Sequence, residues 1–437
     1  MTDLLAARSQ MAISLGFHII FAVVGMAMPL LMVIAEAMWL RTGDMGYRLL
    51  AYRWSKGTAV MFAVGAVSGT VLSFELGLLW PEFMNLAGPV IGLPMSLEGF
   101  AFFFEAIFLG IYLYGWDKVP KLVHLASGVI VLICGVASGA FVVTANAWMN
   151  TPVGFEWDGD ALVSVDPWAV LTGPMAVSQV LHMVVAAFLA VGFAVAAIHA
   201  WVILKGSKKA FHRRALAIAL AVGGVSALIQ PLTGHKSGET VAEYQPIKLA
   251  AMEGHFHTEA AAPLVILGWP DEEARETRWA IHIPYALSIL AHGDPHAEVL
   301  GLEEFPEDEW PPVAVVHIAF QIMIATGVAM ATVSLIGAFL TIRYRRVPLQ
   351  RWFLWMVVAC GPLGIIGIEA GWTVTEVGRQ PWIIYGVMRT SEAVTPMPGL
   401  QVPLISFTIL YLVLGAVVLM LIKKLVAEPI EEDAGDA

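Results

Sequence analysis

The stretch Glu369-Ala-Gly-Trp-Thr-Val-Thr-Glu-Val-Gly-Arg-Gln-Pro-Trp382 follows directly on an apolar run. A carboxylate at the edge of hydrocarbon is costly unless a cation, a metal or water meets it, so Glu369 is expected to have a partner inside the protein. The same holds for Arg379. The Gly, Pro and Trp at the end of the stretch break the helical pattern where a membrane helix would reach the lipid headgroups. A helix that simply ends at the interface explains those three residues equally well, but it explains Glu369 poorly.

Composition places the whole chain in a membrane. Its 437 residues are 58% hydrophobic and 14% charged, with a mean hydropathy of +0.76, whereas a soluble domain has about 25% charged residues. The first apolar run, from Met11, is too long for a cleavable signal peptide. Cys134 and Cys360 lie inside apolar runs, so disulfides, Cys-ligated clusters and covalently attached haem are not expected. The net charge of −11 is spread through loops, and no nucleic-acid partner is indicated.

Apolar stretches long enough to cross a bilayer occur nine times, and each is expected to be a helix, since backbone groups in lipid must pair within their own segment. The predicted spans are 11–39, 54–79, 96–116, 122–146, 175–203, 215–232, 313–342, 352–374 and 402–422. The predicted fold is therefore an all-α polytopic membrane protein with nine transmembrane helices.

The distribution of basic residues predicts the orientation. One set of connections carries 17 of the 24 Lys and Arg residues, and the other set carries seven. The positive-inside rule then places the N-terminus outside and the C-terminus in the cytoplasm, which agrees with an odd number of spans.

Four regions follow from this count: helices one to six over 1–232, an external loop over 233–312, helices seven to nine over 313–425, and an acidic cytoplasmic tail over 426–437. The outer connection 147–174 is acidic. Within the long loop, Gln245-Pro-Ile-Lys-Leu-Ala-Ala-Met-Glu-Gly254 predicts a short helix that carries Lys248 and Glu253. A solvated surface helix is the simpler interpretation of that pattern.

Ionisable and thioether side chains recur inside the spans, where they are uncommon. Alternating topology puts five of them, from five different helices, at a similar depth in the outer half: His18, Glu98, His182, Met323 and Glu369. Glu105 follows Glu98 by two helical turns, so both carboxylates share one face. A single intramembrane His often only bonds another helix, and a single Met often only packs. His and Met together in a helix bundle suit axial ligation of haem iron, which leaves a face open for oxygen when only one protein ligand is present.

These residues resemble subunit I of the cytochrome bd-type quinol oxidases of bacterial and archaeal respiratory membranes. The resemblance extends over nearly the whole chain and rests on five motifs: Arg8-Ser-Gln10, Phe17-His-Ile-Ile-Phe21, Leu97-Glu-Gly99, Thr144-Ala-Asn-Ala-Trp-Met149 and Gly378-Arg-Gln-Pro-Trp382, the last preceded by Glu369-Ala-Gly-Trp372.

The resemblance implies a role for each matching position. His182 and Met323 match the ligands of a low-spin haem b, while His18 and Glu369 match ligands of two high-spin haems, one a haem b and the other a haem d or a further haem b. Glu98 matches a carboxylate beside the oxygen-reducing haem. Further matches are Glu105, Ser138 and Asn146 on a proton route, and Lys248 and Glu253 in the quinol-binding loop. Arg379 resembles a haem-propionate or structural partner in the motif, and Trp372 a cofactor contact.

Two features depart from the family pattern. Family members often have Arg two residues before the ligand Met, where this chain has Gln321. A neutral amide stabilises nearby negative charge less, so the low-spin haem is expected to differ in potential or in its carboxylate contacts. The external loop is short and resembles the cyanide-insensitive branch, in which some members carry haem b in place of haem d.

The function implied is an electrogenic quinol:O2 oxidoreductase in the cytoplasmic membrane. Quinol would be oxidised at the outer face and O2 reduced to water with cytoplasmic protons, without a pump. The expected partners are membrane lipid, a subunit II and a small single-span subunit. A dihaem cytochrome b anchor of a dehydrogenase and a proton-coupled transporter using the buried carboxylates are the alternatives.

Overall fold

The structure is a computed structural model that describes residues 2–158, 161–207 and 209–427. Within them, nine helices are long and apolar enough to cross a membrane, which confirms the all-α polytopic fold. They are α1 (Asp3–Thr42), α2 (Met45–Leu79), α3 (Pro81–Tyr114), α4 (Lys121–Asn150), α6 (Ala176–Leu204), α7 (Ala210–Tyr244), α10 (Val313–Tyr344), the pair α11 (Arg351–Cys360) and α12 (Leu363–Val377), which together make one span, and α14 (Gln401–Ala427). Most of the acidic tail, 428–437, lies outside the described residues.

The helices are longer than the hydropathy pattern predicted. α1 begins at Asp3 rather than at residue 11, α3 begins at Pro81, and α7 continues to Tyr244. Hydropathy marks only the part of a helix that lies in hydrocarbon, whereas backbone hydrogen bonding continues where polar residues meet water. The eighth span is interrupted at Gly361 and Pro362, since proline has no N–H for the helical ladder.

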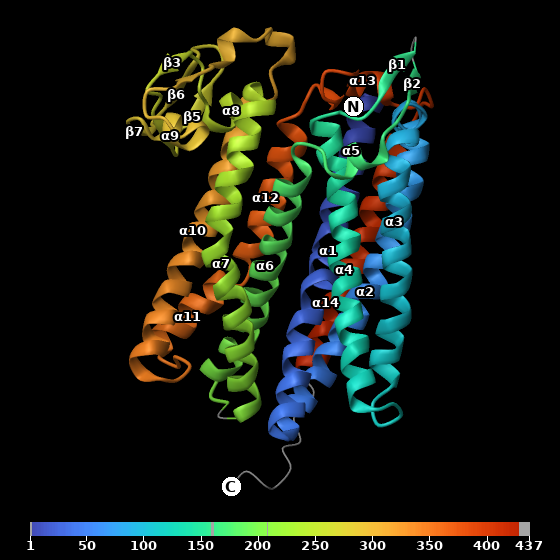
Figure 1. Cartoon of the computed structure of the whole chain (residues 1–437), viewed down its shortest axis with the longest axis vertical. Coiled ribbons are helices and arrows are strands. Elements are labelled where there is room, and N and C mark those ends of the chain that lie inside the picture. Colours follow the sequence, from blue (N-terminus) through green and yellow to red (C-terminus); the bar gives the residue numbers. More distant parts are fainter. Residues whose placement is uncertain (1, 159–160, 208, 428–437) are drawn as a thin grey trace.

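All the small elements gather at one end of the bundle, together with the N-terminus (Figure 1). They are the helices α5 (Pro167–Leu171), α8 (Pro246–Glu253), α9 (Ala286–His292) and α13 (Thr390–Ala393), two 3-10 turns, Leu302–Glu304 and Glu307–Glu309, and ten short strands. The strands form five antiparallel pairs: β1 (Glu156–Asp158) with β2 (Ala161–Val163), β3 (Glu259–Ala260) with β8 (Glu298–Val299), β4 (Leu264–Ile266) with β7 (Ile281–Ile283), β5 (Trp269–Asp271) with β6 (Glu276–Arg278), and β9 (Trp382–Ile384) with β10 (Met388–Arg389). We call this the loop end.

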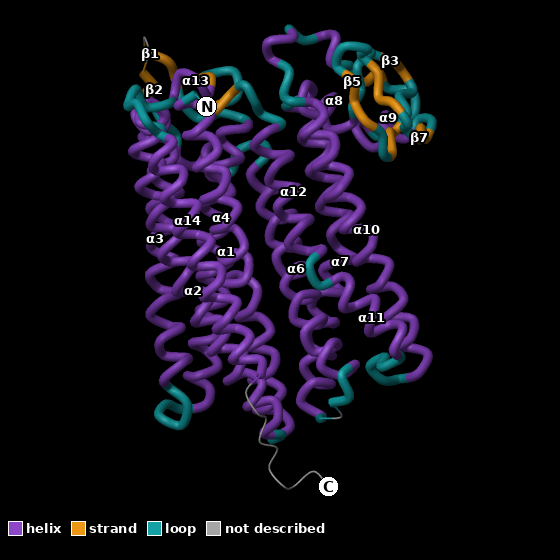
Figure 2. Tube along the Cα trace, turned by 180° about the vertical axis from the view of Figure 1, so that it is seen from behind, coloured by secondary structure: helices purple, strands orange, loops and turns teal. Residues whose placement is uncertain are grey.

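The opposite end carries the connections α1–α2, α3–α4, α6–α7 and α10–α11, as both views show (Figures 1 and 2). We call it the basic end, because these connections hold most of the Lys and Arg residues. The two classes of connection therefore lie at opposite ends of the bundle, as the sequence predicted. Which end faces the cytoplasm stays a prediction.

Small residues allow the helices to approach closely. A Cβ at Gly192 of α6 would lie 2.5 Å from the Cα of Gly223 on α7, and a Cβ at Gly364 of α12 would lie 2.4 Å from the Cα of Ala190 on α6. Close backbone approach at such positions is the usual basis of helix packing in lipid. It joins α12 to α6 and α6 to α7, and both α7 and α12 contact α10.

Candidate functional site

Helix α8 lies inside the protein at the loop end. Pro246 occupies its first turn and Gly254 ends it in the left-handed conformation, with φ 62°. Every residue from Ile247 to Glu253 is buried, which excludes the solvated surface helix. The apolar members pack into a core that includes residues of α10 and α12. Two ionisable side chains, Lys248 and Glu253, are thereby carried into the interior.

Burial changes the acidity of both groups. It lowers the pKa of Lys248 well below its usual value, and the nearby Arg379 charge adds to that effect. Burial raises the pKa of Glu253 to about 8. Glu253 Oε2 has no hydrogen-bond partner among the described residues. A buried carboxyl group of this kind can exchange a proton near neutrality.

Helix α10 fastens the loop above α8. His317 places Nδ1 2.9 Å from the Met252 carbonyl oxygen and Nε2 3.1 Å from the Leu267 carbonyl oxygen. One turn further along α10, Gln321 Nε2 donates to the Val265 carbonyl at 3.0 Å, and Leu267 N donates to Gln321 Oε1 at 3.1 Å. The sequence suggested that Gln321 would influence a haem. In the structure, both the NH2 and the C=O of its side-chain amide bind the loop backbone.

The Gly-Arg-Gln-Pro-Trp motif forms the end of α12 and the turn after it. Arg379 is 2% exposed, and its Nη2 donates to Glu376 Oε2 at 2.6 Å. Its Nε and Nη1 have no hydrogen-bond partner among the described residues. Unpaired buried N–H groups are costly, so this guanidinium suits an acceptor such as a carboxylate or a quinol oxygen.

A hydrogen-bonded chain joins the motif to α8. Lys248 Nζ donates to Asn150 Oδ1 at 2.5 Å. Asn150 Nδ2 donates to the Asn146 carbonyl at 2.9 Å, and Asn146 Nδ2 donates to Glu376 Oε1. Glu376 and Asn150 were not singled out in the sequence. The only signal for Glu376 was its position one turn before Arg379.

His182 lies on α6 against α7. Its Nδ1 is 3.1 Å from Gln230 Nε2 and 3.3 Å from Thr233 Oγ1, and a Cβ at Gly234 would lie 3.3 Å from its Cε1. Met323 lies on α10 against α12, where a Cβ at Gly371 would lie 2.9 Å from its Sδ. The four helices concerned contact one another as α6–α7, α7–α10, α10–α12 and α12–α6.

His18 and Glu369 lie at a similar level of α1 but on different sides of it, since His18 projects toward α2 and Glu369 reaches α1 at Gly16. His18 Nδ1 is 2.9 Å from Ser68 Oγ of α2. Two residues before His18, a Cβ at Gly16 would lie 3.3 Å from Glu369 Oε2 and 3.9 Å from the Trp372 ring. Glu369 Oε1 is buried and has no hydrogen-bond partner in the described part of the chain. A further partner for this carboxylate therefore stays a prediction.

The predicted proton-route residues fall into two groups. Ser138 Oγ of α4 donates to Glu98 Oε1 of α3 at 3.2 Å. Glu105, on the same face of α3, lies where a Cβ at Gly135 would be 3.4 Å from its Oε1. Asn146 lies instead at the loop end beside Glu376.

The donor set fits iron porphyrins. Imidazole, thioether and carboxylate groups lie on separate helices, each packed against a glycine of a neighbouring helix, and Glu369 Oε1 has no hydrogen-bond partner among the described residues. Imidazole and thioether groups are protein ligands that haem iron accepts.

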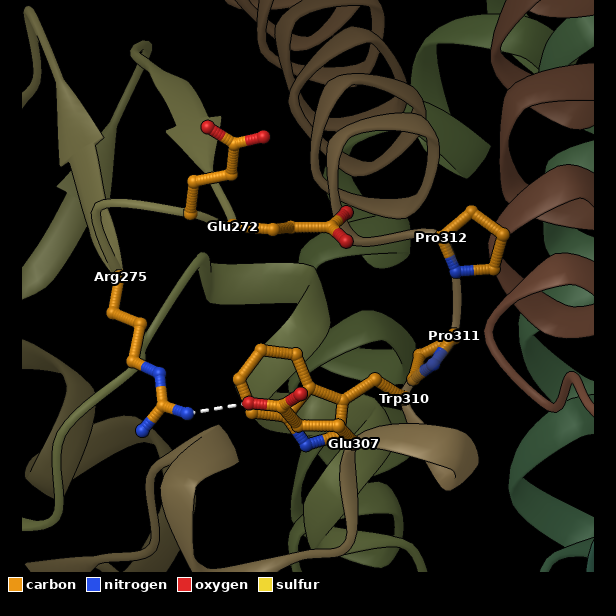
Figure 3. A pocket seen from close by; sticks show the side chains of 7 residues that line it. Glu272, Arg275, Glu307, Trp310, Pro311 and Pro312 are labelled. Carbon is orange, nitrogen blue, oxygen red and sulfur yellow. Dashed lines mark hydrogen bonds and ion pairs between the residues drawn. The ribbon is translucent and has the colours of Figure 1, made fainter.

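A separate open cavity at the loop end does not belong to this site. It has a volume of about 640 Å³ and is lined by Glu272, Glu273, Arg275, Glu307, Trp310, Pro311 and Pro312. Arg275 Nη2 pairs with Glu307 Oε1 at 2.5 Å across it (Figure 3). Neither Lys248 nor Glu253 lines it.

Comparison with known proteins identifies the family. Residues 6–430 match the family model described as cytochrome bd terminal oxidase subunit I. The chain is 39% identical to a Bacillus subtilis (strain 168) protein named "Putative cytochrome bd menaquinol oxidase subunit I", over 100% of both chains. It is 30% identical to the cytochrome bd ubiquinol oxidase subunit 1 of the same organism, over 99% of this chain and 95% of that one.

A solved structure agrees. The bd oxidase of Geobacillus thermodenitrificans matches with a TM-score of 0.92 and 42% identity, over 97% of this chain and 98% of the other. These matches favour the oxidase subunit over the two alternatives, a dihaem cytochrome b anchor and a proton-coupled transporter. The chain belongs to the cytochrome bd terminal oxidase subunit I family and is a haem-containing quinol oxidase subunit of the bacterial membrane, where it works with subunit II.

Proposed function

We propose that this subunit oxidises quinol beside α8 at the loop end and that protons for reducing O2 to water come from the basic end. The loop end would then face outside, with the C-terminus in the cytoplasm. Since quinol protons leave on one side and consumed protons arrive from the other, turnover would build a membrane potential without a pump. The observation that carries this proposal is the burial of Lys248, Glu253 and Arg379 in one region of the loop end.

Glu253 is the proposed acceptor for a quinol proton. Its unpaired Oε2 can accept a hydrogen bond from a quinol hydroxyl, and its pKa near 8 lets it take and release that proton near neutral pH. Lys248 would hold a quinol oxygen, and the Asn150 hydrogen bond keeps its Nζ in place. Gln321 and His317 would keep the loop docked on α10 over this pocket.

Side chains from α1, α6, α10 and α12 are the proposed haem ligands. His182 and Met323 would hold the low-spin haem b. His18 and a carboxylate of α12 would hold the two high-spin haems, one a haem b and the other a haem d or a further haem b. The sequence points to Glu369 for that carboxylate, and the structure adds Glu376 as the second one near the motif. When bound, the haems supply one-electron transfer and the chemistry of O2 reduction.

The protein's own residues would place these groups and move protons. Arg379 offers two unpaired N–H groups to a haem carboxylate, and Trp372 lies beside Glu369. Glu98, held by Ser138, and Glu105 would relay protons along α3. A small single-span partner stays an expectation from the resemblance.

The Glu253→Gln variant of the purified complex tests the quinol site. We expect quinol oxidation to fall about a hundredfold, the lower end of what a positioned proton-transfer group contributes, with oxidation of an artificial reductant retained. Glu298→Gln is the matched control, because Glu298 is an exposed carboxylate of the same loop. Equal loss of both activities in Glu253→Gln would argue against a role at the quinol site.

A further inference from the structure

A second buried cluster of ionisable side chains lies at the basic end, far along the bundle from α8. His124, in the first turn of α4, places Nδ1 2.8 Å from Glu36 Oε1 of α1 and Nε2 2.9 Å from the Tyr112 carbonyl of α3. The side chains of His124 and Glu36 are 4% and 0% exposed. Tyr112 is also fully buried. The cluster thus joins three helices around groups that can exchange protons.

The hydrogen-bond partners indicate where the protons lie. A carbonyl oxygen can only accept, so His124 Nε2 carries a hydrogen, and Nδ1 shares one proton with Glu36. Glu36 Oε2 and the Tyr112 hydroxyl are buried without a well-formed hydrogen bond to any described residue. The hydroxyl nevertheless lies in the electrostatic field of Glu36. Buried polar atoms with unused capacity are the usual sites of ordered water.

The cluster continues the row of carboxylates on α3. Glu98, Glu105 and Tyr112 are spaced seven residues apart, so they lie on one face of that helix. Glycines of α4 face Glu105 and Tyr112. A Cβ at Gly135 would lie 3.4 Å from Glu105 Oε1, and a Cβ at Gly128 would lie 2.7 Å from Tyr112 Cε2. The same seam between α3 and α4 therefore holds the proposed relay groups and the Tyr112 ring.

The other side of the cluster lies close to water. Trp39 is one turn beyond Glu36, and the Trp116 ring is 4.1 Å from that of His124. The Arg48 guanidinium lies 5.4 Å from both indole rings and pairs with Asp117, whose side chain is 77% exposed. This aromatic and ionic layer connects the cluster to the exposed Asp117 side chain at the basic end.

We propose that Glu36, His124 and Tyr112 are the proton entry to the Glu105 relay. This inference rests on the proposed function, in which the consumed protons come from the basic end. A proton from water at the surface would bind Glu36. The Tyr112 hydroxyl, through an intervening water, would accept a proton from Glu36 and release its own toward Glu105. Each proton taken up is matched by one released, so the cluster returns to its starting charge and no electrons move.

A purely structural ion pair that fastens α1 to α4 is the competing explanation, and two variants separate it from the proposal. Tyr112→Phe removes the hydroxyl, which interacts with Glu36, and keeps the ring that packs under Gly128. Glu36→Gln keeps the volume and a hydrogen-bonding oxygen but cannot relay a proton. His199→Gln is the matched control, because His199 is a buried histidine near the basic end that contacts His212 on α7 rather than the seam.

The complete oxidase complex would be reconstituted in liposomes containing a trapped pH dye, and quinol-driven O2 consumption and proton uptake would be recorded. We expect Tyr112→Phe and Glu36→Gln to slow both about tenfold, less than the full effect of a positioned proton-transfer group because water can partly substitute. Their reduced-minus-oxidised haem spectra should match the wild type, as should the rates of His199→Gln.

Each other outcome is decisive. Wild-type rates of O2 consumption and proton uptake in both Tyr112→Phe and Glu36→Gln would overturn the proposed proton entry. An equal loss of these rates in His199→Gln would overturn it too. If Glu36→Gln fails to assemble, Tyr112→Phe decides alone, since it keeps the ring and the hydrogen bonds of His124 to Glu36 and to the Tyr112 carbonyl. If the wild-type complex itself takes up no protons from the basic end, the proposed function fails, and that result is separate from any variant.

Discussion

Lys248 and Asn150 are joined by a 2.5 Å hydrogen bond from Nζ to Oδ1, although 98 positions separate them in the chain. The bond connects the loop helix α8 to the end of α4, and through Asn146 and Glu376 it reaches Arg379. The loop proposed to bind quinol is therefore tied to the end of the helix that carries the proposed haem carboxylates.

Lys248→Met should lower quinol oxidation by up to about tenfold, because a hydrogen bond contributes about 0.5–1.5 kcal/mol. The measurement is steady-state oxygen consumption with quinol and, separately, with an artificial reductant. Lys236→Met is the control, because Lys236 is exposed on α7 and pairs only locally with Glu239. Unchanged quinol oxidation in Lys248→Met would contradict the assignment.

Quinol oxidation should depend on the protonation of Glu253. Burial raises its pKa to about 8, so at pH 6 the side chain is protonated and cannot accept a proton. As the pH rises through about 8, the carboxylate form increases, and the rate with saturating quinol should rise with it. This increase in rate with pH should be absent from the residual activity of Glu253→Gln. A pH profile of the same shape in both proteins would show that another group titrates.

Met323→Leu should remove the six-coordinate low-spin optical signal and leave the high-spin haems, since leucine has no thioether. Reduced-minus-oxidised spectra and a pyridine haemochrome assay measure both. Met330→Leu, two turns further along α10 and buried, should keep the wild-type spectrum. A wild-type spectrum in Met323→Leu would exclude this residue as a ligand.

The carboxylate ligand on α12 can be located by comparing Glu369→Gln with Glu376→Gln. One of the two variants should lose a high-spin haem, whereas the other should keep the full haem content. Glu369 has an unpaired buried oxygen, whereas both oxygens of Glu376 already bind Asn146 or Arg379. Full haem content in both variants would mean that α12 supplies no ligand.

Gln321→Leu should loosen the loop over α10. It removes two hydrogen bonds to the loop backbone, each contributing about 1 kcal/mol. Hydrogen exchange of the amides in 264–267 should become faster, and Ile322→Leu, a conservative change at an exposed neighbour, should leave it unchanged. Wild-type exchange in Gln321→Leu would show that His317 alone holds this segment.

Much of the fold could be predicted because it follows from local chemistry. A bilayer requires long apolar helices, so their number was evident, but their ends were not: α7 extends to Tyr244 because a helix continues into water without a hydropathy signal. The break at Gly361 and Pro362 lay within an apolar run, where hydropathy alone hides it.

The candidate site was predicted less completely. Lys248 and Glu253 could be found from the motif, but their burial could not, since an eight-residue helix with two charges looks solvated in isolation. Asn146 was expected with Glu105 and Ser138, whereas its side chain donates to Glu376. A position in the sequence fixes the helix that a side chain comes from but not the neighbour that it contacts.

The sequence by itself determined the membrane class, the nine spans, the opposite placement of basic and acidic connections and the family, because each depends on composition, periodicity or a local motif. Only the tertiary structure decided that Gln321 binds the loop backbone, that Asn150 holds Lys248, and that Glu36, His124 and Tyr112 meet. Such contacts join residues distant in the chain, and the packing of whole helices against one another decides them.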